Sequence, residues 1–167
     1  MEPWNSNTSP VCGCSELVYW VHGFRRRNTL LHGGSYSINK THVVRWLRPH
    51  MGWWKCNTDG ASRGNPGPSA TAFCIRNSAG DLVGAKGVKI QDSTKIMAEA
   101  ITVREGLQYC WEQSLIQVIL ESDSYALVKM LNGEWDVPWS VTLEVNSMNR
   151  LRELMTVHMS LISSGSS

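Results

Sequence analysis

The sequence lacks any run of about 18 apolar residues, the length that a membrane-spanning helix needs. Its first twenty residues also lack a basic segment followed by an apolar stretch, so a secretory signal is not expected. No internal repeat is visible. These absences favour an intracellular protein of the nucleus or cytoplasm, neither secreted nor partnered with a membrane.

The sequence also lacks a cysteine pattern typical of a disulfide framework or of a structural metal site. The five cysteines are odd in number and irregular in spacing. Cys12 and Cys14 have no second pair at zinc-ligand spacing, which argues against a zinc site. Cys56, Cys74 and Cys110 lie in apolar runs and read as buried small hydrophobic residues. A reducing compartment fits this usage best.

Charge of one sign does not dominate the chain, whose net charge is +2. It is unevenly spread, however. Residues 1–52 carry six Lys or Arg against two Asp or Glu, and residues 53–167 carry ten against twelve. This distribution suits an acidic body that binds metal and a basic arm that touches phosphate. An imbalance of this size can equally have no functional meaning.

A chain of 167 residues with 42% hydrophobic residues can form one domain with a proper core. Residues 1–44 mix Asn, Ser, Gly and Arg and are expected to form a basic, weakly structured arm. Its Arg25–Arg27 run is either a contact for nucleic acid, a nuclear address or a solvated basic patch. Residues 45–162 are expected to fold, and the low-complexity tail 163–167 to be disordered.

Hydrophobic periodicity predicts a mixed sheet with helices packed on it. Alternating or apolar runs predict strands at residues 53–59, 70–76, 81–90, 116–120 and 157–162. Helical periodicity predicts helices at residues 94–112, 124–131 and 140–154. The first three strands form an antiparallel meander, and the strand after the first helix can pair in parallel through a right-handed crossover. The predicted class is therefore α/β.

Three carboxylates fall where this topology can bring them together. Asp59 and Asp123 end the first and fourth predicted strands, and Glu99 lies one turn into the first predicted helix. Each has a plainer explanation, since Asp59–Gly60 suits a turn, a helical Glu is usually exposed, and Asp123 can cap a helix. Converging carboxylates need a cation to neutralise them, and Mg²⁺ or Mn²⁺ prefer such oxygen ligands.

The motifs resemble a known family. The stretches TDGASRGNPGP at 58–68, AEA at 98–100 and ESDS at 121–124 are similar to the ribonuclease H domain. The lead-in RWLRPHMGWWKCNTDG and the later VPWS resemble in particular the ribonuclease H-like domains of plant non-LTR retroelements and their domesticated relatives. The resemblance covers about residues 45–162 and implies the ribonuclease H-like fold with its five-stranded mixed sheet.

That resemblance implies hydrolysis of the RNA strand of an RNA–DNA hybrid by a monomeric protein. It implies that Asp59, Glu99 and Asp123 hold two Mg²⁺ ions, with Mn²⁺ as a substitute. It further implies that the substrate-binding residues are Gly60, Asn65 and Ser124, with Asn65 contacting the hybrid through its minor groove.

The family's fourth carboxylate has no counterpart here. It belongs to a helix after the fifth strand, and the sequence ends at Ser167 where that segment would begin. His158 is no convincing stand-in for the family's mobile histidine. We therefore expect weakened cleavage, which leaves a hybrid-binding module without catalysis as one alternative. A domesticated interaction domain is another, which exposure of Trp46, Trp53 and Trp54 would support, although we expect these side chains to be buried.

Overall fold

The computed structural model describes residues 47–162. The predicted arm at 1–44, the predicted tail at 163–167, Cys12, Cys14 and Trp46 lie outside these residues. Within them, the order of strands and helices is the one that the periodicity predicts.

Five strands form one mixed sheet in the order β3-β2-β1-β4-β5. β1 pairs antiparallel with β2 and β2 with β3, whereas β4 pairs parallel with β1 and β5 parallel with β4. The predicted mixed sheet is therefore confirmed. The strands are β1 Trp54–Ser62, β2 Gly67–Arg76, β3 Leu82–Ser93, β4 Gln117–Ser122 and β5 Thr156–Leu161.

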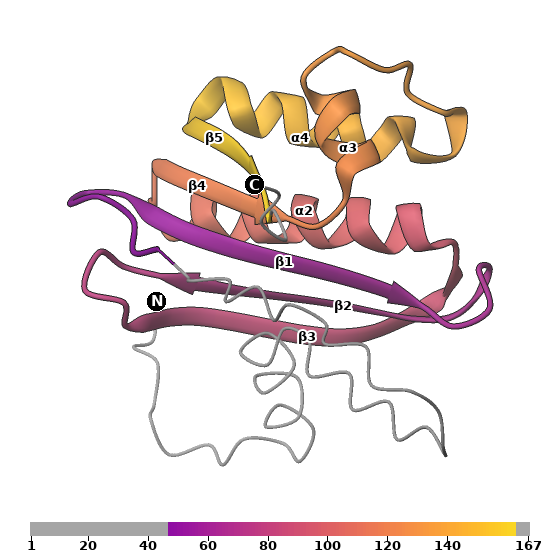
Figure 1. Ribbon diagram of the computed structural model, residues 1–167, viewed down its shortest axis with the longest axis horizontal. Coiled ribbons are helices and arrows are strands. Elements are labelled where there is room, and N and C mark those ends of the chain that lie inside the picture. Colours follow the sequence, from indigo (N-terminus) through magenta and orange to yellow (C-terminus); the bar gives the residue numbers. More distant parts are fainter. Residues whose placement is uncertain (1–46, 163–167) are drawn as a thin grey trace, which may run out of the picture.

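The helices gather on one side of the three long antiparallel strands (Figure 1). α2 (Lys95–Glu112) packs on β1 and β2 and contacts α4 (Thr142–Leu154), and the short α3 (Tyr125–Leu131) follows β4. The predicted helix at 140–154 begins with a 3-10 turn at Trp139–Val141. Thr94 caps α2 by accepting a hydrogen bond from the Met97 N–H at 3.3 Å, as expected for that residue type.

The core lies between the sheet and these helices. Its members come from β1, β2, α2, β4, α3 and α4, and the fully buried ones include Cys56, Ile75, Leu107, Leu120 and Met148. All three cysteines in the described part of the chain are buried, as predicted. The expected burial of the tryptophans is met in part, because Trp53 and Trp54 are half-buried and Trp54 packs against the core.

One strand end differs from its prediction in a way that matters for the site. β1 does not stop at Asp59 but continues to Ser62, because its antiparallel ladder with β2 runs on to the pair Ser62–Ser69. The parallel ladder with β4 ends earlier, at the pair Thr58–Ser122. Asp59 therefore lies where β4 leaves β1, rather than at a strand end. Among residues 47–162, no helix combines the length and the apolar character that crossing a bilayer requires.

Candidate active site

The point where β4 leaves β1 carries two of the three predicted acids. Thr58 and Ser122 form the last parallel pair, and the next residues along the two strands are Asp59 and Asp123. Neighbouring strands are about 4.8 Å apart, so residues at this register position start close together. Asp59 is half-buried and Asp123 is exposed. The C-terminal edge of the parallel strands thus presents both carboxylates, as the sequence predicts.

Glu99 reaches the same place because α2 lies directly on β1. Gly60 is buried, and a Cβ built on it would stand 2.4 Å from the Ala98 carbonyl carbon and 2.4 Å from the Glu99 nitrogen. Only glycine allows the strand and helix backbones to approach this closely. Ala98 is fully buried at this contact, and Glu99 is only 6% exposed. The small residues on either side of Glu99, Ala98 and Ala100, are both fully buried and leave room for this close packing.

Ser124 connects Glu99 to the β4 end. Its hydroxyl donates a hydrogen bond to Glu99 Oε2 and accepts one from the Leu127 N–H at 3.4 Å, which makes Ser124 the cap of α3. Its own N–H donates to Ser122 Oγ at 3.2 Å, and the residue is 4% exposed. Ser124 therefore orients the Glu99 carboxylate, and the substrate contact implied by the family resemblance stays a prediction.

Asn65 lies in the turn between β1 and β2 and holds the start of α2. Its Oδ1 accepts a hydrogen bond from the Lys95 N–H at 2.7 Å. Its φ of 38° falls in the left-handed region, which Asn tolerates better than most residues. The Arg63 N–H donates to the Pro68 carbonyl oxygen at 2.9 Å and closes the turn. For Asn65 and for Gly60, contact with a substrate likewise stays a prediction.

The three acids influence one another electrostatically. Burial raises the pKa of Asp59 to about 6, with further contributions from the negative charges of Asp123 and Glu99, while the charge of Lys95 lowers it. Burial also raises the pKa of Glu99, against the hydrogen bond from Ser124 and the charge of Lys95. These mutual effects are the signature of carboxylates that share one small region.

Lys95 is a site residue that the sequence analysis missed. Its Nζ lies 3.3 Å from Glu99 Oε1, so a cation already neutralises the buried carboxylate. The spacing that allows this ion pair is visible in the sequence, since Lys95 and Glu99 are four residues apart on a predicted helix. An exposed helical lysine gave no reason to single it out.

An ion pair near the site, between Lys55 and Glu121, was also not predicted from the sequence. Lys55 Nζ lies 2.6 Å from Glu121 Oε1, and Asn57 Nδ2 donates to Glu121 Oε2 at 2.6 Å. Lys55 is only 4% exposed. The pair joins β1 to β4, with Lys55 four residues before Asp59 and Glu121 two residues before Asp123. Its members are 66 positions apart in the chain, so no local sequence pattern indicates it.

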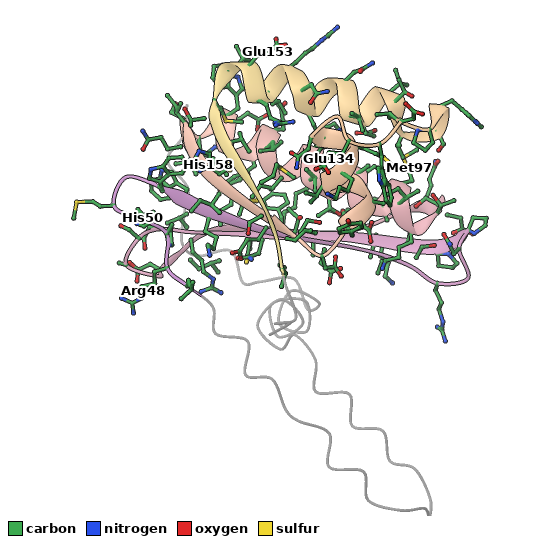
Figure 2. The ribbon with its side chains drawn as sticks, turned by 45° about the horizontal axis from the view of Figure 1, so that its top comes forward. Arg48, His50, Met97, Glu134, Glu153 and His158 are labelled. Atoms are coloured by element: carbon green, nitrogen blue, oxygen red, sulfur yellow. The ribbon has the colours of Figure 1, made fainter. Side chains whose placement is uncertain are left out.

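His158 takes no part in this region. It is an exposed residue of β5 and pairs with Ile119, three positions before the end of β4. Its ring lies 4.6 Å from that of Trp53 (His158 is labelled in Figure 2). This placement agrees with the expectation that His158 does not stand in for the family's mobile histidine.

The donor set suits a hard divalent cation, because the carboxylates of Asp59, Glu99 and Asp123 lie near enough to influence one another and carboxylate oxygens are the ligands that such cations prefer. The side-chain geometry is less complete. Among residues 47–162, no three His, Cys, Asp or Glu side chains stand close enough to hold one metal ion. Both carboxylate oxygens of Glu99 already have partners, since Lys95 contacts one and Ser124 the other.

Comparison with known proteins agrees with the fold and the motifs. The family described as reverse transcriptase-like matches residues 57–163. A ribonuclease H protein of Arabidopsis thaliana is 32% identical over 123 residues, which are 71% of this chain and 20% of that protein. Ribonuclease HI of Halobacterium salinarum is 35% identical over 78 residues, which are 47% of this chain and 39% of that protein. The chain therefore spans well under half the length of these relatives.

Solved structures show the same fold. RNase H1 of Halobacterium salinarum superposes with a TM-score of 0.64 at 24% identity, covering 67% of this chain and 86% of that one. LC11-RNase H1, solved in complex with an RNA/DNA hybrid, superposes with a TM-score of 0.61 at 19% identity, covering 66% and 86%. Since the family match extends over more than half of the sequence, the chain belongs to the reverse transcriptase-like family of ribonuclease H-like domains.

Proposed function

We propose that this domain hydrolyses the RNA strand of RNA–DNA hybrids, with Asp59, Glu99 and Asp123 as ligands of two Mg²⁺ ions. The observation that supports the proposal is the placement of these acids: Asp59 and Asp123 directly follow the last parallel pair of β1 and β4, and the close contact of Gly60 with α2 brings Glu99 onto β1. Relatives named ribonuclease H, and a structural neighbour solved with a hybrid, support the same reaction and substrate.

In this proposal the chain's own residues position the reaction rather than take part in covalent chemistry. Two bound Mg²⁺ ions would lower the pKa of the attacking water and stabilise the leaving 3′ oxygen. Asp59 is held by the β1 ladder, and Glu99 is held by the close contact of α2 with Gly60 and by the Ser124 hydroxyl. Asn65 stands in the adjoining turn, where it would meet the minor groove of a hybrid.

The test is cleavage of a labelled RNA–DNA hybrid in Mg²⁺ and in Mn²⁺ by the wild-type chain, Asp59→Asn and Glu153→Gln. Glu153 is a suitable control because it is exposed near the end of α4, well away from Met97 in the first turn of α2 (Figure 2). We expect cleavage by the wild type and Glu153→Gln, and a loss of at least about 100-fold in Asp59→Asn. Equal cleavage by all three proteins would refute the assignment of Asp59.

A second candidate is a hybrid-binding module without catalysis. The incomplete geometry favours it, because no three potential ligands in the described part of the chain are gathered around one point. Such a module would bind hybrid equally well in EDTA and in Mg²⁺, and would cleave it in neither. An interaction domain would bind hybrid no better than a mild polycation does, and its affinity would collapse at moderate salt.

A further inference from the structure

Lys95 occupies a position that helix stability does not explain. It is the first residue of α2, where the helix dipole favours negative rather than positive side chains, and the first turn of α2 contains no acidic residue. Its pairing with Glu99 also has the weaker orientation, because Glu followed by Lys four positions later is more stabilising than the reverse. Helix stability alone therefore gives no reason for a lysine at this position.

The backbone of Lys95 is held in place, and its side chain reaches Glu99 one turn further along the helix. Its N–H donates to Asn65 Oδ1 at 2.7 Å, and Thr94 caps the same turn. Residues four apart lie on one face of a helix. The placement of Lys95 beside the acids is therefore built in by the turn between β1 and β2 as well as by α2.

The contact between Lys95 and Glu99 joins a buried carboxylate to an exposed ammonium group. The Glu99 side chain is 6% exposed and its Oε2 is held by Ser124, whereas the Lys95 side chain is 60% exposed and its Nζ lies 3.3 Å from Oε1. An exposed ammonium group can return to solvent at small cost, and exposed ion pairs contribute little. A buried carboxylate without a cation, in contrast, is costly.

We propose that the Lys95 ammonium is the internal counter-ion of the acidic cluster, which a divalent cation must displace from Glu99 before Glu99 can bind it. Lys95 thereby weakens the affinity of the site for metal and holds the cluster together when the metal concentration is low. This inference rests on the proposed function, because it takes Glu99 as a metal ligand.

The experiment is calorimetric titration of the full chain with MnCl₂, for the wild type, Lys95→Gln, Lys95→Arg and Arg150→Gln. Arg150→Gln removes the same charge from an exposed position on α4. We expect Lys95→Gln to bind Mn²⁺ about fivefold more tightly than the wild type, as displacing an exposed ion pair predicts. Lys95→Arg and Arg150→Gln should bind like the wild type.

Thermal unfolding supplies a second readout. In EDTA, Lys95→Gln should unfold at a lower temperature than the wild type, and saturating Mn²⁺ should raise its midpoint by more than it raises that of the wild type. Equal or weaker Mn²⁺ binding by Lys95→Gln, with binding by the wild type intact, would overturn the role of Lys95 and leave the proposed function standing. Absence of Mn²⁺ binding in all four proteins would overturn both.

Discussion

Removing the charge of Asp59 should stabilise the protein in the absence of metal. The pKa of Asp59 rises from 3.8 to about 6 on folding, chiefly through burial and then through the charges of Asp123 and Glu99. Folding therefore penalises the ionised form of this carboxyl group. One pKa unit corresponds to about 1.4 kcal/mol, so the penalty at neutral pH is about 2–3 kcal/mol.

The pH dependence has a definite sign. Because the folded-state pKa lies above the unfolded one, the folded protein holds more protons between pH 3.8 and about 6. The contribution of Asp59 to stability therefore falls as the pH rises through that window, and the full penalty is present above it. Asp59→Asn carries no charge at any pH and escapes this penalty.

Urea unfolding in EDTA at pH 8 and at pH 4 measures the effect. At pH 8 we expect Asp59→Asn to exceed the wild type by about 2–3 kcal/mol in free energy of unfolding. At pH 4 most of this difference should be lost, and Glu153→Gln should stay within about 0.5 kcal/mol of the wild type at pH 8. An Asp59→Asn protein that is no more stable than the wild type at pH 8 would refute the reasoning.

Two further substitutions test how Glu99 is held. Gly60→Ala should lower the free energy of unfolding by about 1–3 kcal/mol and reduce cleavage, because the added Cβ meets the α2 backbone. In the control Gly133→Ala the Cβ meets open space, so this variant should lose only the roughly 1 kcal/mol that a left-handed backbone costs alanine. Comparable urea midpoints for Gly60→Ala and the wild type would contradict this prediction. Ser124→Ala should lower the free energy of unfolding by about 1–2 kcal/mol, because the cap of α3 is lost. It should also shift the acid limb of the pH–activity profile to higher pH, because the hydroxyl that lowers the pKa of Glu99 is lost. An unchanged profile would argue against that hydrogen bond.

Periodicity and spacing predicted the element order, the mixed sheet and the neighbouring positions of Asp59 and Asp123, whereas the joint role of Asp59, Glu99 and Asp123 as metal ligands stays a prediction. They could do so because alternation, helical stripes and turn residues are local properties of the sequence. The end of β1 was predicted wrongly because the length of a strand also depends on its pairing partner, which is not a local property of the sequence. A strand ends where its partner stops pairing, and β2 continues beside β1 to Ser62.

The side-chain contacts around the acids could not be read from the sequence. Ser124 and Glu99 are 25 positions apart, and Lys55 and Glu121 are 66 apart. Such pairs depend on how strands and helices are placed in three dimensions. Hydrophobic patterning does not say which side chains then come into contact. Lys95 lay within a local pattern, but a lysine on a helix surface is so common that its position carried little information by itself.

The contact between Gly60 and α2 has a consequence for how far the sequence of such a domain can change. At this point the strand and the helix meet through main-chain atoms, which every amino acid shares. Further along α2 the contact is with side chains instead, since a Cβ built on Gly106 would stand 2.9 Å from Cys56 Sγ. Exchanges of buried residues such as Val103 and Leu107 for others of similar volume are therefore tolerated better than any side chain at position 60.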